Sequence, residues 1–245
     1  MLCSSLIASG MAGYPMDYID GRYLTAFQRV RGTWSMATYF DDLETRRTSP
    51  NGLFGVKVKP HQIEHTFGLA QHDAHQFIRS FDRFIRIYRR DKLGQAISLM
   101  LAQESSVWVG DAPDAQRGPD RRDPSDDLNN VARSLALVAQ EDHAWRTIIR
   151  ELRLTTLDIA YEDLIADPSK ELLRVFEWLG VDVTPTKIPL PKIVHQPSGS
   201  DAIKHAFLRE VGFNSLALLP ARASRDRQGW TTSGAATDRR HGSPV

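Results

Sequence analysis

The chain has 245 residues, of which 41% are hydrophobic, and its formal net charge is +1 at pH 7. This length is enough to bury a core in one domain, and the balanced charge argues against nucleic acid or an anionic membrane as partner. A single cysteine, Cys3, excludes an intramolecular disulfide and a CxxC motif, which is typical of a reducing compartment. No apolar run reaches the roughly 20 residues that cross a bilayer, and no signal-like segment opens the chain. We therefore expect a cytoplasmic protein without a transmembrane segment.

The first part of the chain predicts a helix, a loop and a buried strand. Residues 2–9 read as a short helix, with Gly10 as a suitable C-cap. The turn that follows places Asp17 in a loop. Residues 52–58 alternate like a buried strand, and Pro60 suits the first turn of a helix.

A second apolar strand, residues 84–88, runs directly into Arg89 and Arg90 and then into an amphipathic helix. Guanidinium groups at the end of a strand, beside the start of a helix, form an anion site. Ser98 lies two turns into this helix, so Arg90 and Ser98 together can grip one phosphate. Arg89 is either a second phosphate contact or a surface charge. The alternative for the whole segment is a solvated sheet edge with a surface serine.

The second half of the chain continues the alternation. Residues 128–150 predict a long helix, 155–160 a third strand and 169–179 a further helix. Strands that alternate with helices indicate an α/β domain on a parallel sheet, with ligands at the carboxyl ends of the strands. The pattern weakens from about residue 197, and the composition of residues 221–245 predicts a disordered tail.

Five stretches, in their order along the chain, resemble one family. They are LCSSLIASGMAGYPMDYI (2–19), NGLFGVKVKPHQ (51–62), RRDKLGQAIS (89–98), AQESSVW (102–108) and WRTIIRELRLTTLDIAYEDLIADPSKELLRVFEWLGV (145–181). They are similar to the Stf0 family of bacterial sulfotransferases, and the resemblance covers about residues 2–196. It implies a three-layer α/β sulfotransferase fold, in which helices flank a parallel sheet, over residues 1–196. Residues 197–245 would then form a weakly patterned C-terminal region.

The resemblance also implies an activity. Stf0 enzymes transfer a sulfuryl group from PAPS (3'-phosphoadenosine 5'-phosphosulfate) to a sugar hydroxyl, and sulfation of trehalose is the activity first described for them. We therefore expect PAPS as cosubstrate, no metal, a small carbohydrate acceptor such as trehalose or a related glycoside, and a homodimer.

Candidate residues carry over by position. Asp17 stands in GYPMDY where the family pattern G-x-P-x-E has a glutamate proposed as the catalytic base, although aspartate is one methylene shorter and a plain turn residue is the alternative. Arg90 and Ser98 correspond to ligands of the 3'-phosphate. Lys57 is either a contact to the sulfuryl group or acceptor, or a lysine that snorkels at a strand edge. Trp108 either stacks on a sugar face or only packs.

The family signature YEDL, residues 161–164, is expected to be structural. In it we expect Glu162 and Asp163 to satisfy the N-terminal amides of the helix that they open.

The resemblance begins after the first part of the family pattern. Family members begin with a strand and an R-S-G-S-T type of loop that holds the 5'-phosphosulfate, and Met1 stands where this loop would end. We therefore expect a first strand and loop to be encoded upstream in frame, with a decayed and inactive gene copy as the alternative. A chain without the loop would act as a non-catalytic module that binds nucleotide or protein, because the donors for the leaving group would be missing.

A second class of enzyme also has a motif in the chain. His61, Glu64 and His65 form H-x-x-E-H, the inverzincin pattern, on a helix that would start at Pro60. The match is short and lies within the Stf0-like stretch. We therefore keep zinc binding as a minor alternative.

Overall fold

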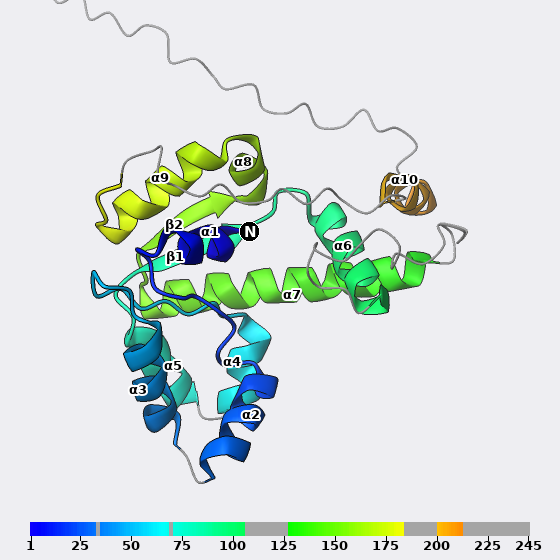
Figure 1. Cartoon of the computed structure of the whole chain (residues 1–245). Helices are drawn as coiled ribbons and strands as arrows, with labels where there is room; N and C mark the ends of the chain where they lie inside the picture. The colour runs from blue at the N-terminus through cyan, green and yellow to red at the C-terminus, as the bar shows by residue number, and fades with distance from the viewer. Residues whose placement is uncertain (33–34, 69–70, 106–126, 184–199, 213–245) are drawn as a thin grey trace, which may run out of the picture. The chain divides into compact units, whose positions relative to one another are not determined.

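The computed structural model describes residues 1–32, 35–68, 71–105, 127–183 and 200–212 (Figure 1). The chain divides into a compact unit of Met1–Phe207 and a second unit of Leu208–Val245. The core clusters and the candidate site described below all lie in the first unit.

The described residues form helices around a small sheet of two strands. In chain order the elements are α1 (Leu2–Ser9), α2 (Gly21–Arg31), α3 (Met36–Arg47), α4 (Pro60–Phe67), α5 (Gln71–Arg79), β1 (Phe84–Tyr88), α6 (Lys92–Ser105), α7 (Leu128–Leu152), β2 (Thr156–Ala160), α8 (Tyr161–Ala166), α9 (Pro168–Leu179) and α10 (Ser200–Glu210). None of the helices among these residues is both long and apolar enough to cross a membrane.

The two strands are parallel and run in register from Phe84 opposite Thr156 to Tyr88 opposite Ala160. Ile85 and Ile159 belong to a core cluster with residues of α1, α8 and α9. Phe84 belongs to a different cluster with residues of α4, α5 and α7, as expected because successive side chains in a strand point to opposite faces. The prediction of a mixed α/β fold with a parallel sheet is confirmed, whereas the three-layer arrangement and the missing first strand stay predictions.

Several helix boundaries follow local sequence signals. Helix α1 ends at Gly10 and α9 at Gly180, both in the left-handed conformation that glycine adopts at low cost. Pro60 stands in the first turn of α4, where its missing N–H needs no partner. These boundaries were predicted from the sequence.

The long helix α7 has its own core with α6 and α10. Ile97 and Met100 of α6 pack with Val131 of α7 and Ile203 of α10. Ile97 and Val131 are fully buried. This cluster confirms the predicted apolar face of the helix that follows the arginine pair, and it includes Ile203 and Phe207 of α10.

One predicted strand is wrong. Residues 52–58 run extended, but among the described residues they make only a single parallel bridge, Val56 opposite Met16. Gly55 lies against Pro15 of the facing segment, where an added Cβ would come within 3.2 Å of the proline Cβ. Because proline has no N–H to donate, the pairing cannot extend past this point.

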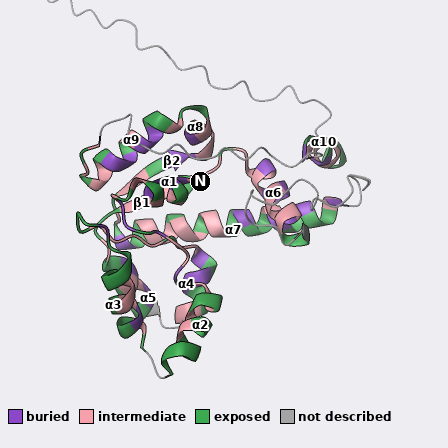
Figure 2. Cartoon of the chain, in the orientation of Figure 1, coloured by how far each residue is buried: buried purple, intermediate pink, exposed green. Residues whose placement is uncertain are grey.

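Helices α2, α3 and α5 were not predicted from the sequence. No residue of α2 is buried, and Tyr39 is the one buried residue of α3, so much of both helices is exposed or half-buried (Figure 2). In α3 the apolar periodicity is correspondingly weak. Both helices have side-chain N-caps, Asp20 and Ser35, which were the available signals.

Candidate functional site

Asp17 and Lys57 are 40 positions apart in sequence and lie side by side in the structure. The backbone N–H of Gly13 donates to Ser49 Oγ over 3.0 Å, and that of Lys57 donates to the carbonyl of Met16 over 2.9 Å. These bonds align the two extended segments. Lys57 Nζ consequently reaches Asp17 Oδ2 at 2.7 Å.

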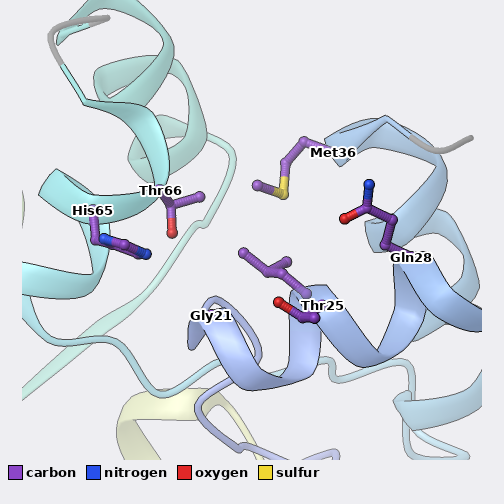
Figure 3. Close-up of a pocket in the computed structure, with 7 residues that line it drawn as sticks. Gly21, Thr25, Gln28, Met36, His65 and Thr66 are labelled. Atoms are coloured by element: carbon purple, nitrogen blue, oxygen red, sulfur yellow. The ribbon is translucent and has the colours of Figure 1, made fainter.

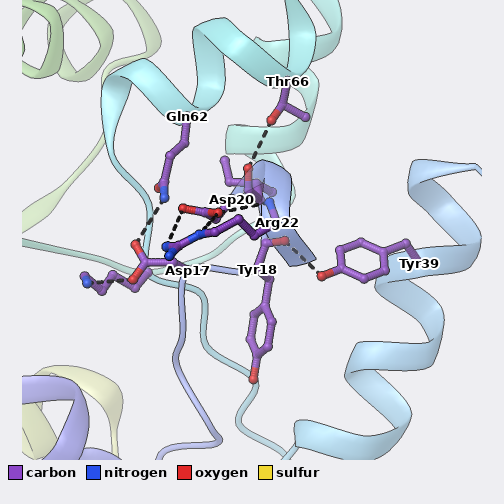
Figure 4. A network of polar contacts seen from close by, with 9 residues as sticks. Asp17, Tyr18, Asp20, Arg22, Tyr39, Gln62 and Thr66 are labelled. Carbon is purple, nitrogen blue, oxygen red and sulfur yellow. Dashed lines mark hydrogen bonds and ion pairs between the residues drawn. The ribbon is translucent and has the colours of Figure 1, made fainter. Parts of the chain in front are cut away.

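Gln62 of α4 completes this group, as Figure 4 shows. Its Oε1 accepts a hydrogen bond from the backbone N–H of Lys59 over 2.9 Å, which fixes the orientation of the amide. Its Nε2 then donates to Asp17 Oδ1 over 3.3 Å. An ionised carboxylate has about four lone-pair directions, so both oxygens of Asp17 can still accept a hydroxyl proton. The side chain is 24% exposed, which leaves access for a ligand.

A polar network next to Asp17 holds the start of α2. Asp20 caps this helix by accepting from the backbone N–H of Arg22, and its carboxylate pairs with the Arg22 guanidinium over 2.8 Å. The contact with Arg22 lowers the pKa of Asp20 to about 2. On the other side, the Tyr39 hydroxyl donates to the carbonyl of Tyr18 over 2.9 Å, and burial raises the pKa of Tyr39 to about 12. Asp17 therefore extends from a backbone that is fixed on both sides (Figure 4).

A small hollow of about 240 Å³ lies between α2, α3 and α4 (Figure 3). Its lining residues are Gly21, Leu24, Thr25, Gln28, Met36, His65 and Thr66. Hydroxyl, amide and imidazole groups therefore line it together with two apolar side chains. Such a mixture is compatible with a polyhydroxylated ligand.

The arginine pair lies at the carboxyl end of β1, as predicted, but the two residues differ in their contacts. Arg90 forms a two-pronged salt bridge with Asp163 of α8, in which Nη1 lies 2.7 Å from Oδ1. Its backbone N–H and that of Asp91 donate to the Glu162 carboxylate over 3.0 and 3.2 Å. The hydrogen bonds that the Arg90 guanidinium donates to the Asp163 carboxylate raise the pKa of Arg90 above its ordinary value.

This geometry corrects the role expected for Glu162 and Asp163. Neither side chain caps α8, whose N-cap residue Ala160 has no side-chain cap. Both carboxylates instead accept hydrogen bonds from Arg90, in the loop between β1 and α6. Folding brings this loop next to α8. Their acidic character was visible in the sequence, but their partner 72 or 73 positions away was not.

Arg89 and Ser98 have different neighbours. The Arg89 guanidinium lies 4.0 Å from the centre of the Tyr161 ring, a cation–π contact. Ser98 is half-buried on α6, and its hydroxyl donates to the carbonyl of Gly94 over 2.9 Å. The hydroxyl oxygen keeps its acceptor capacity, and rotation of the hydroxyl would aim its proton at a ligand.

Beside the arginine pair is a second hollow, with a volume of about 350 Å³. It is lined by Arg86, Arg89, Arg90, Lys92 and Arg146, with Tyr88 and Asp142. Positive charge therefore concentrates at this end of β1, although the whole chain is nearly neutral.

Two other predicted sites have less structural support. The Nδ1 of His61 contacts Glu141 of α7, and His65 lines the hollow between α2 and α4. In the described part of the chain, no three His, Cys, Asp or Glu side chains are grouped so that they could hold a metal ion. Trp108 lies outside the described residues.

Comparison with known proteins identifies the family. The model of the Stf0 sulphotransferase family matches residues 1–202. The chain is 26% identical over 213 residues to a trehalose 2-sulfotransferase of Mycobacterium tuberculosis, covering 78% of this chain and 76% of the relative. It is 23% identical over 254 residues to a trehalose 2-sulfotransferase of Mycolicibacterium smegmatis, covering 89% of this chain and 93% of the relative. The chain belongs to the Stf0 sulphotransferase family.

Proposed function

We propose that the protein transfers a sulfuryl group from PAPS to a hydroxyl of trehalose or a related glycoside. The observation that carries the proposal is the contact of Asp17 with Lys57 and Gln62, in which a partly exposed carboxylate is held by two donors. The names of both relatives, trehalose 2-sulfotransferases, support a carbohydrate acceptor.

In this proposal Asp17 is the general base. Its carboxylate takes the proton of the acceptor hydroxyl, and the hydroxyl oxygen forms a bond to sulfur while the bond from sulfur to the phosphate oxygen breaks. Adenosine 3',5'-bisphosphate leaves with the electron pair of that bond. Lys57 holds Asp17 in place at 2.7 Å, and its positive charge offsets negative charge on the sulfuryl oxygens. Such transfers depend mainly on positioning and on charge stabilisation.

The proposed nucleotide site is the end of β1 with Arg89, Arg90 and Ser98. Because the Arg90 guanidinium is already paired with Asp163, its salt bridge with that carboxylate would have to break before Arg90 could bind the 3'-phosphate. Arg89, over the Tyr161 ring, can turn to a phosphate at lower cost. We therefore assign the 3'-phosphate first to Arg89 and Ser98, with Arg90 as a further contact. Trp108 remains the proposed stacking partner of the sugar.

Binding measurements separate the two arginines. We expect Arg89→Ala to weaken binding of adenosine 3',5'-bisphosphate in calorimetry by at least about tenfold, because a charged hydrogen bond is lost. Asp163→Asn frees Arg90, so tighter binding in that variant would make Arg90 the main ligand instead. Unchanged binding in Asp163→Asn together with a loss in Arg89→Ala supports our assignment.

A transfer assay with PAPS and trehalose tests the base. Asp17→Asn should lower kcat by about 100-fold or more, while the Kd of adenosine 3',5'-bisphosphate stays unchanged. Asp17→Glu, which restores a carboxylate, is the matched control and should keep more activity than Asp17→Asn. Full activity of Asp17→Asn would refute the assignment. Nucleotide binding without transfer to any glycoside by the unaltered chain would favour the alternative of a non-catalytic nucleotide-binding module.

A further inference from the structure

The cationic hollow beside β1 contains groups that the proposed transfer does not use. Arg86 and Tyr88 lie on the same face of β1 as Phe84, which packs with Trp145 and Ile148 of α7. The hollow therefore lies on the face of β1 that α7 covers. Arg89 and Arg90, which belong to the proposed nucleotide site, also line the hollow.

Lys92, the first residue of α6, is the most unusual of these groups. Its Nζ is shielded from solvent and lies 2.6 Å from Asp142 Oδ2, the one partner that the described residues give it. Arg146 Nη2 contacts the same oxygen over 3.2 Å. An ammonium group has three N–H donors, and a single carboxylate oxygen cannot satisfy all of them. Shielded donors without acceptors are costly, so an additional acceptor in the hollow would be favourable.

The balance of charge points the same way. Arg86 and Arg90 each have a carboxylate of their own, Asp158 and Asp163. Lys92 and Arg146, in contrast, share the single carboxylate of Asp142. Burial alone would raise the pKa of Asp142, but its contacts with Lys92 and Arg146 lower it, so the carboxylate stays ionised. Its single negative charge faces the two positive charges of Lys92 and Arg146.

We propose that this hollow is a binding site for a phosphate- or sulfate-type oxyanion, with Lys92 and Arg146 as its ligands and Arg86 at its side. Its volume of about 350 Å³ exceeds what one such group needs. The oxyanion is either free or part of a larger ligand such as the nucleotide, because both present the same oxygen atoms to the cations. The site is argued from its own contacts and does not depend on sulfuryl transfer.

Calorimetric titration of the full chain with inorganic pyrophosphate tests the site. Lys92→Gln and Arg146→Gln should each weaken pyrophosphate binding by about tenfold or more, because each removes a charge-assisted hydrogen bond. Arg150→Gln is the matched control: Arg150 is an exposed residue of the same helix, one turn further on, and does not line the hollow. The proposal is refuted if pyrophosphate does not bind, or if all three variants weaken binding equally, since that would indicate only general attraction between charges.

A gain of affinity cannot be produced by misfolding, so Asp142→Asn is the decisive variant. Asp142 competes with the oxyanion for Lys92 and Arg146, and its neutralisation should tighten pyrophosphate binding by about tenfold. Weaker or unchanged binding in folded Asp142→Asn would overturn the proposal.

A third titration identifies the source of the oxyanion and separates this proposal from the proposed function. Competition between adenosine 3',5'-bisphosphate and pyrophosphate would support a nucleotide phosphate in the hollow, and simultaneous binding would support a separate oxyanion. Ser98→Ala should weaken binding of the nucleotide but leave pyrophosphate binding unchanged. A chain that binds pyrophosphate as proposed but neither binds nor uses the nucleotide would refute the proposed function alone.

Discussion

Asp20 shows how one residue connects stability, pH and the site. It caps α2 and pairs with Arg22, and its pKa of about 2 lies below the ordinary value of 3.8. A carboxyl whose pKa falls on folding stabilises the protein above its unfolded pKa, and this contribution is lost as the pH falls through the folded pKa. Asp20→Ala should therefore lower the free energy of unfolding by about 1 kcal/mol near neutral pH.

The pH dependence of that difference is the measurement. Urea unfolding of the unaltered chain and of Asp20→Ala should give curves that converge between about pH 4 and pH 2, where Asp20 becomes protonated. Asp20→Asn keeps a capping oxygen without the charge, so it should lose less stability than Asp20→Ala. A difference that stays constant down to pH 2 would show that the charge of Asp20 has no role.

Lys57 is the second residue whose role can be tested by itself. Its side chain is 44% exposed and its Nζ contacts Asp17, so Lys57→Met should hardly change stability, as is usual for an exposed ion pair. We expect it to lower kcat by about tenfold to 100-fold in the trehalose assay, because both the position of the base and a positive charge are lost. A normal kcat would show that Lys57 is a surface lysine.

At the scale of elements, one glycine sets the distance between the two segments that carry Asp17 and Lys57. Gly13 has φ +67°, and an added Cβ would lie 2.7 Å from the carbonyl oxygen of Leu53. Gly10 has the same φ, but its added Cβ would meet nothing within 4 Å. At both positions an alanine would be strained by the left-handed backbone, but only at Gly13 would its Cβ also collide with a neighbouring segment.

This pair gives a matched prediction for the loop. Gly10→Ala should lower the free energy of unfolding by about 1 kcal/mol through backbone strain alone. Gly13→Ala should cost about 3 kcal/mol or more, because the facing backbone must also move. Any folded Gly13→Ala should also lose transfer activity, since the Asp17–Lys57 contact depends on this approach. Equal thermal unfolding temperatures for the two variants would contradict the argument.

At the scale of the whole molecule, residues 200–207 of α10 belong to the compact unit Met1–Phe207. Ile203 is buried with residues of α6 and α7, and Lys204 Nζ lies 2.7 Å from Asp91 Oδ2. A chain that ends at residue 212 should keep the thermal unfolding temperature of the full chain within about 2 °C. A chain that ends at residue 199 should unfold about 5 °C lower or more, since the buried Ile203 is lost. Equal temperatures for both would support the predicted end of the domain at residue 196 instead.

The sequence by itself determined the features that depend on neighbouring residues. Helix α1 with its Gly10 cap, strand β1, the proline start of α4 and the glycine end of α9 follow from local propensity and capping. The order of the family motifs along the sequence also predicted the family, and the match of the family model to residues 1–202 confirms this prediction.

Only the tertiary structure decided which side chains meet. The pairing of Asp17 with Lys57 spans 40 positions, and that of Arg90 with Asp163 spans 73. Neither pairing can be predicted from the spacing of the residues in the sequence, because contacts between distant segments depend on how the chain packs. For Asp163 the sequence also favoured another role, since acidic residues at a predicted helix start are expected to cap that helix. The strand predicted for residues 52–58 failed for the same reason: strands need a partner able to pair, and the facing segment contains Pro15.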